Sequence, residues 1–187
     1  MLLSLRTAVL IASLQVLCTS LPAQAELTGE RQIYLLDGQG VEQAIGSLTI
    51  AADGDRYGYS IDLDLSQFHD HFLSMKEMKC LQGPELWCYV PYPYANPRSF
   101  TTEDLRWLEH DLLFLFKESD TFGARLWNGI YYPLHLDEDG VIRGEARALD
   151  LNLLASPPDD PSTPPVGKFD IGDFKLESRW LPDIEIR

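Results

Sequence analysis

Asp-Gly pairs between apolar stretches constrain the fold of this chain more than any other sequence feature. The three pairs are Asp37-Gly38, Asp53-Gly54 and Asp139-Gly140. Glycine readily adopts the positive φ angles that tight hairpin turns require, so such a pair between two strand-like runs predicts a β-hairpin. The expected strands around these turns are 32–36, 47–51, 57–65, 130–136 and 141–149. Neighbouring strands joined by short turns predict an antiparallel sheet.

Residues 57–65 show the clearest strand pattern. Tyr, Ile and Leu occupy every second position, and Gly, Ser and Asp stand between them. Successive side chains of a strand point to opposite faces, so this alternation predicts one buried face and one acidic face in water.

The helix candidate is 101–118, where Thr101 is the predicted N-cap and Asp104 takes the capping-box position. Leu105, Leu108 and Leu112 follow with helical spacing. However, residues 112–116 are all apolar, which favours a buried strand there. We therefore expect a short helix that ends near 109–111, followed by a strand.

The remaining segments complete the expected fold. We predict a short helix or a loop over 67–78, an extended connector over 89–97, a proline-rich surface loop over 156–165, and one or two short strands within 169–186. The predicted fold class is mainly β (α+β). It is a single domain whose antiparallel sheet is curled or closed into a small barrel, with one helix near 101–110.

Residues 1–25 have the pattern of a cleavable secretory signal. Arg6 precedes an apolar run over 8–17, and Ala23-Gln24-Ala25 is a small-x-small cleavage site. An uncleaved membrane anchor and a lipoprotein signal at Cys18 are the alternatives. The signal interpretation leaves one globular β-rich domain over 26–187 and predicts a periplasmic or secreted location.

Two cysteines, Cys80 and Cys88, then remain, and an oxidising compartment favours a disulfide between them. A redox-active pair is the alternative, but the Cys-x-x-Cys spacing of thioredoxin-like proteins is missing. We therefore predict a structural disulfide.

The charge balance narrows the set of partners. The chain has 29 Asp and Glu against 15 Lys and Arg, a formal net charge of −14. Such a chain repels nucleic-acid backbones and anionic lipids, so we expect no nucleic-acid partner. No long apolar run follows the signal, so no membrane span is expected after its removal. A basic protein partner is compatible with this charge, and solubility is the simpler explanation.

The sequence has no catalytic motif for a serine hydrolase, a zinc protease or a phosphate-binding loop. His69 and His71 would share a face if they lay on a strand, and His110 is a conceivable third metal ligand. A helical 67–78 would instead separate the two imidazoles. We predict no catalytic residues and no cofactor.

Aromatic residues in predicted loops are the preferred binding candidates. Tyr and Trp combine a large contact area with one polar group, which suits binding surfaces. Packing in the core of a small β protein is the alternative. The candidates are Trp87, Tyr92, Tyr94, Trp127 and Tyr131.

Three stretches, 79–94, 104–117 and 127–132, carry a resemblance. With them, the chain resembles a set of conserved secreted proteins of proteobacteria. The resemblance implies a periplasmic location and no assigned activity or site residues.

These observations predict a non-enzymatic exported domain that binds a small ligand or a partner. One alternative is an acidic protein module that docks a basic partner, as an inhibitor does. The other is a metal-dependent enzyme that uses His69 and His71.

Overall fold

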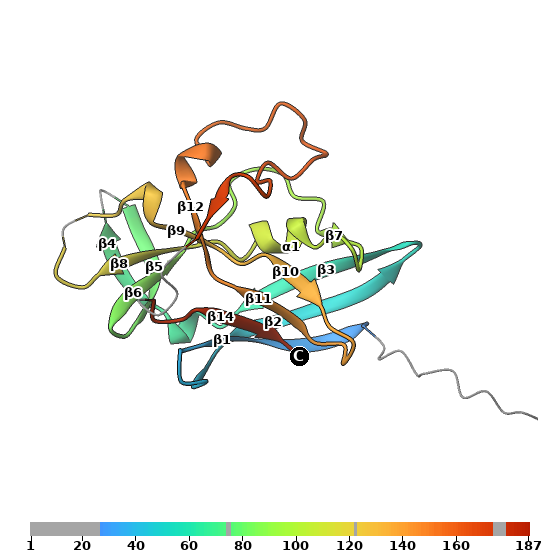
Figure 1. Ribbon diagram of the computed structural model, residues 1–187, viewed down its shortest axis with the longest axis horizontal. Coiled ribbons are helices and arrows are strands. Elements are labelled where there is room, and N and C mark those ends of the chain that lie inside the picture. Colours follow the sequence, from blue (N-terminus) through green and yellow to red (C-terminus); the bar gives the residue numbers. More distant parts are fainter. Residues whose placement is uncertain (1–26, 74–75, 122, 174–178) are drawn as a thin grey trace, which may run out of the picture.

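The computed structural model describes residues 27–187 except 74–75, 122 and 174–178. The predicted signal and its cleavage site therefore lie outside the described residues. Two seven-stranded sheets make up the fold, and every pairing between described strands is antiparallel. The sheets curl into a half-barrel around one short helix (Figure 1). The predicted fold class is confirmed.

The first sheet contains the N-terminal and C-terminal strands. Its strands in spatial order are β10 (Leu134–Leu136), β11 (Ile142–Glu145), β14 (Asp183–Ile186), β1 (Gly29–Leu36), β2 (Glu42–Asp53), β3 (Arg56–Leu63) and β7 (Ser99–Phe100). All three predicted Asp-Gly hairpins are present, as the β1–β2, β2–β3 and β10–β11 turns. C-terminal β14 lies between β11 and β1, so the first and the last described strands pair within the interior of the sheet.

The second sheet contains the central part of the chain. Its strands in spatial order are β13 (Ile171–Gly172), β12 (Arg147–Leu149), β9 (Gly129–Tyr131), β8 (Phe114–Glu118), β6 (Glu85–Tyr89), β5 (Lys76–Gln82) and β4 (His69–Leu73). Among the described strands the chain crosses from one sheet to the other six times. The crossings from β9 to β10 and from β11 to β12 take only two residues and one residue, so the two sheets share a corner there. The predicted strands over 130–136 and 141–149 were therefore wrong as continuous strands, because each is divided between the two sheets at this corner.

Two apolar clusters cover the two faces of the second sheet. The larger one fills the space between the sheets and includes Trp87, Phe114 and Ile33. The smaller one includes Leu115 and Tyr131, and is closed by the 3-10 helix η3 (Leu151–Leu154) and by Val166. Because Phe114 and Leu115 of β8 are buried in different clusters on its two faces, the strand begins with consecutive apolar residues instead of alternating ones. The polar residues Lys117 and Glu118 end it.

Helix α1 (Arg106–His110) and strand β8 confirm the predicted split of residues 101–118. The predicted N-cap was wrong. Leu105 occupies that position without a side-chain hydrogen bond, whereas Thr101 and Asp104 close a separate turn before the helix. This turn satisfies the Asp104 backbone N–H, so the helix begins one residue after Leu105.

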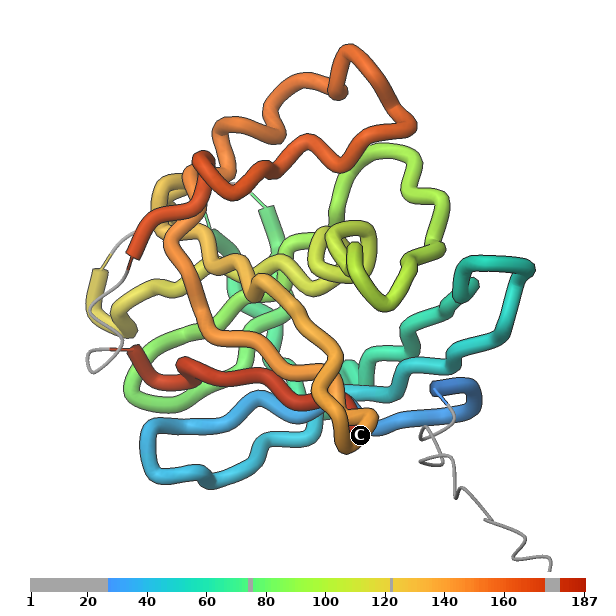
Figure 2. Tube along the Cα trace, turned by 45° about the vertical axis from the view of Figure 1, so that its right-hand side comes forward, coloured from blue at the N-terminus to red at the C-terminus, as the bar shows by residue number. Residues whose placement is uncertain are grey.

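The prediction of a helix or loop over 67–78 was wrong. A 3-10 turn, η1 (Leu65–Gln67), leads into β4, which pairs with β5. Strand β4 is an edge strand whose residues are mostly exposed, including Phe72. It therefore lacks the apolar alternation by which a half-buried strand is recognised. The predicted connector over 89–97 and the loop over 156–165 are present, and Figure 2 shows the latter along one edge of the molecule.

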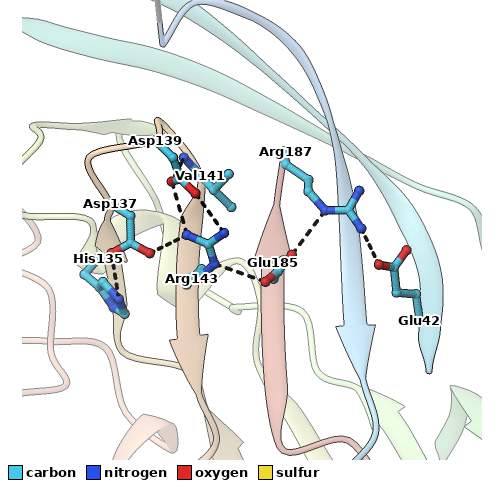
Figure 3. Close-up of polar contacts among 8 residues, drawn as sticks. All are labelled: Glu42, His135, Asp137, Asp139, Val141, Arg143, Glu185 and Arg187. Atoms are coloured by element: carbon cyan, nitrogen blue, oxygen red, sulfur yellow. Dashed lines mark hydrogen bonds and ion pairs between the residues drawn. The ribbon is translucent and has the colours of Figure 1, made fainter. Parts of the chain in front are cut away.

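Ion pairs cross the outer face of the first sheet (Figure 3). Arg143 on β11 pairs with Asp137, Asp139 and Glu185, and thus joins the β10–β11 turn to β14. Arg187 pairs with Glu185 and with Glu42 of β2. Several carboxylates are therefore already matched by cations. No helix within the described ranges is long and apolar enough to cross a membrane.

Candidate ligand site

The five predicted aromatic binding residues occupy three different environments. Trp87 and Tyr131 are 0% and 2% exposed and belong to the two apolar clusters. Tyr92 and Tyr94 are half-buried and pack edge to face, with ring centroids 5.7 Å apart. Trp127 is 61% exposed on η2 (Leu126–Asn128). The structure therefore does not bring these five side chains together.

Tyr92 and Tyr94 close the smaller apolar cluster near α1. The Tyr94 hydroxyl donates to the Leu154 carbonyl at 2.9 Å, which fastens the 89–97 connector to η3. The Tyr92 ring contacts His110, with centroids 5.2 Å apart. The Tyr92 hydroxyl oxygen is buried and has no hydrogen-bond partner among the described residues.

His69 and His71 lie on β4, so the alternation of a strand places them on the same face, as the metal interpretation requires. His71 Nε2 is 2.8 Å from the Gln82 amide nitrogen. His110 is fully buried beside Tyr92 and does not join them. In the described part of the chain, no three His, Cys, Asp or Glu side chains are grouped to hold a metal ion.

The disulfide between Cys80 and Cys88 is present and joins directly opposed residues of β5 and β6. Both cysteines are fully buried in the smaller apolar cluster. This environment agrees with a structural role, because a redox-active cysteine needs access to its reaction partner.

Helix α1 presents buried titratable side chains that the sequence did not single out as a group. Glu109 accepts hydrogen bonds from the Tyr131 hydroxyl and from the Leu134 backbone N–H. Burial raises the pKa of Glu109 to about 7, and these two hydrogen bonds oppose the rise. The carboxyl therefore holds β9 and β10 against the helix.

His110 follows Glu109 in the chain, and its pKa is shifted in the opposite direction. Burial lowers the pKa of His110 to about 4, so the imidazole is neutral. Its Nδ1 donates to the Arg106 carbonyl at 2.6 Å, and its Nε2 accepts from the Val166 N–H at 3.3 Å. Burial also raises the pKa of Asp111, which accepts from the Tyr59 hydroxyl at 3.0 Å. Each group has its partners within the fold, so we assign this cluster a structural role.

A polar cavity of about 290 Å³ lies at the end of β8. Its walls come from β8, from the segment that leads to η2, and from the chain before β14. The lining residues are Phe116, Lys117, Glu118, Thr121, Gly123, Arg125, Asn128 and Arg179. Three of them are cationic, whereas Glu118 is the one acid among them. This balance is the reverse of the chain as a whole, in which acids outnumber bases.

Lys117 is the most deeply buried of these cations, at 6% exposed. Its ammonium donates to the Glu118 backbone carbonyl at 2.9 Å. Among the described residues, no carboxylate lies within ion-pair distance of it. A buried charge ordinarily has a partner of opposite sign, because removing it from water is costly.

Arg179 reaches the cavity from the other side. Its guanidinium pairs with the buried carboxylate of Glu85 at 2.8 Å and stacks over the Phe116 ring at 4.0 Å. Glu85 also accepts from the Trp87 indole and from the Trp180 backbone N–H, each at 3.2 Å. These contacts fix the position of the Arg179 side chain before any ligand binds.

Arg125 is exposed at the rim of the cavity. Its guanidinium carbon lies 5.9 Å from the centroid of the Trp127 ring, a cation–π geometry. No carboxylate of the described residues pairs with Arg125. The neighbouring Asn128 amide donates to the Phe116 carbonyl at 3.3 Å and fixes η2 against β8.

These three cations come from residues 117, 125 and 179. Comparison with known proteins does not identify the ligand of this cavity. No family model matches the chain, and no curated protein or solved structure matches it significantly.

Sequence reasoning identified Trp127 but not the cations beside it. Lys117 ends the apolar run of β8, and Arg125 lies between that strand and Trp127, so their proximity is local. Arg179 is distant in sequence and is brought in by the pairing of β14 with β1 and β11. Nothing in the sequence pattern signals that part of the site.

Proposed function

We propose that this chain is an exported, non-enzymatic β domain that binds a small ligand in the cavity at the end of β8. The observation that carries the proposal is the cavity itself, whose lining is mostly polar and includes three cations and the Asn128 amide beside the Phe116 ring. Its volume of about 290 Å³ has room for about ten non-hydrogen atoms, since a water molecule in the liquid occupies about 30 Å³. A small metabolite or ion fits this size.

Two features of the cavity walls suit binding. The Glu85 and Phe116 contacts hold Arg179 in place, so little side-chain entropy is lost when a ligand arrives. The exposed Trp127 ring stands beside Arg125 and offers a flat apolar surface at the rim. Small-molecule sites typically combine a few fixed polar groups with such apolar surface.

The proposal is tested by adding small probes to ¹⁵N-labelled protein that lacks residues 1–25. The probes are inorganic phosphate, succinate, glucose and choline, each added at constant ionic strength. We expect at least one of them to shift the amide signals of Gly123 and Asn128 with saturation, and to leave that of Gly54 unchanged. If none of the four shifts the cavity amides at millimolar concentration, the proposal is overturned.

A cavity-filling variant gives the matched control. Thr121→Trp places a bulky ring at the cavity wall, whereas Thr163→Trp makes the same change in an exposed turn. Both threonines use their hydroxyl in a local turn contact, so the two substitutions disturb similar interactions. We expect the first variant alone to lose the probe response. Equal loss in both variants would contradict a site at the end of β8.

A further inference from the structure

We propose that the ligand of this cavity is a small oxyanion, a carboxylate or a phosphate, bound by Arg125 and Arg179 beside Lys117. This inference rests on the proposed function and specifies its ligand class. The juxtaposition of three cations around one cavity, in a chain of formal charge −14, carries it.

The cations of the cavity differ in how far they are already neutralised. Glu85 satisfies part of the Arg179 guanidinium. Within the described ranges, Lys117 and Arg125 have no carboxylate partner, and their polar contacts are one backbone carbonyl and one aromatic face. The lining therefore retains positive charge, which an anion would balance.

The donor types also favour an oxyanion. A guanidinium presents N–H groups in a planar fork that matches two oxygens of a carboxylate or phosphate. The Asn128 amide has a second N–H beyond the one that it gives to Phe116. A cationic ligand would face three like charges, and a neutral one would leave those charges unbalanced.

The Glu118 carboxylate opposes this arrangement from the cavity wall. Its side chain is exposed at the end of β8, so water screens its charge. Lys117 is buried, and its charge is screened less. The electrostatic potential in the cavity thus remains positive. Removing the Glu118 carboxylate is expected to strengthen anion binding.

Isothermal titration calorimetry with inorganic phosphate and with succinate tests this inference. The Arg125→Gln variant is expected to bind the preferred anion about tenfold more weakly, the effect of one lost charge-assisted hydrogen bond. Glu118→Gln is expected to bind it more tightly. Lys168→Gln is the matched control, because Lys168 is also an exposed cation over an aromatic ring, that of Phe169, outside the cavity.

The outcomes separate the two proposals. Binding of phosphate alone or of succinate alone identifies which oxyanion the site takes, and both support the inference. If glucose or choline binds at the cavity and neither anion does, the ligand class is overturned while the proposed function stands. If Lys168→Gln weakens anion binding as much as Arg125→Gln, the attraction is nonspecific and the assigned site is overturned. Arg179 is left unchanged in these variants because its loss would strand the buried Glu85 carboxylate.

Discussion

Replacing Glu109 with glutamine is expected to expose a pH dependence of stability that the native pair of Glu109 and His110 cancels. In the folded protein Glu109 has a pKa of about 7 against an ordinary 4.5, and His110 a pKa of about 4 against 6.5. Between pH 4.5 and 6.5 the folded pair is neutral, whereas the unfolded pair carries one negative and one positive charge. The folded and unfolded states of the pair each bind one proton, so the pair does not change the free energy of unfolding with pH in this range.

Taken separately, each residue makes stability depend on pH in a definite direction. The folded pKa of Glu109 is raised, so the folded state holds an extra proton and its stability falls as pH rises from 4.5 to 7. The folded pKa of His110 is lowered, so the unfolded state holds the extra proton and stability rises from pH 4 to 6.5. Each difference is about 2.5 in pKa, which corresponds to about 3 kcal/mol across its range.

Urea unfolding followed by circular dichroism from pH 4 to 7.5 measures these slopes. For Glu109→Gln, the free energy of unfolding relative to wild type is expected to rise by about 3 kcal/mol between pH 4.5 and 7. For His110→Gln, it is expected to fall by about 3 kcal/mol between pH 4 and 6.5. Glu138→Gln changes an exposed carboxyl in the β10–β11 turn and should give a nearly flat difference.

The nearby charges do not alter these signs. Arg106 stays protonated, and a hydrogen bond with it keeps the pKa of Asp104 low. Burial keeps the pKa of Tyr131 far above this range. A flat difference curve for Glu109→Gln would refute the assignment of a neutral buried carboxyl. A flat curve for His110→Gln would refute the neutral imidazole.

Three further predictions concern the fold. Gly46→Ala should destabilise the protein by more than about 2 kcal/mol, because the new Cβ would lie 2.3 Å from the Asp62 carbonyl oxygen, whereas Gly38→Ala, with open space around it, should cost far less in the same urea titration. Tyr131→Phe removes a hydrogen bond that lowers the pKa of Glu109, so that pKa should rise above 7, as followed by the carboxyl ¹³C shift; an unchanged pKa would contradict the contact. Reducing the β5–β6 disulfide should lower the free energy of unfolding by about 2–3 kcal/mol, and no loss of stability would deny it a structural role.

Local signals in the sequence were sufficient for the hairpins and for the split between α1 and β8. An Asp-Gly pair specifies a turn through its own backbone, and the apolar run over 112–116 reflects burial on both faces of the second sheet. Strand β4 escaped prediction for the opposite reason. It is an edge strand with exposed side chains, so burial leaves no periodic pattern in its sequence.

The candidate site was predictable only in part. Trp127 was identified as an aromatic loop residue, and it does stand beside the cavity. Trp87 was chosen by the same reasoning but is fully buried, since residue type does not tell which face of a strand is covered. Arg179 joins the cavity through long-range strand pairing, which composition and spacing do not encode.

A crystal structure of the protein grown with phosphate or succinate would show directly whether the cavity binds an oxyanion. We expect one anion in the cavity at the end of β8, within hydrogen-bond distance of the guanidinium groups of Arg125 and Arg179. Anions bound only elsewhere on the surface, with water alone in that cavity, would contradict this expectation.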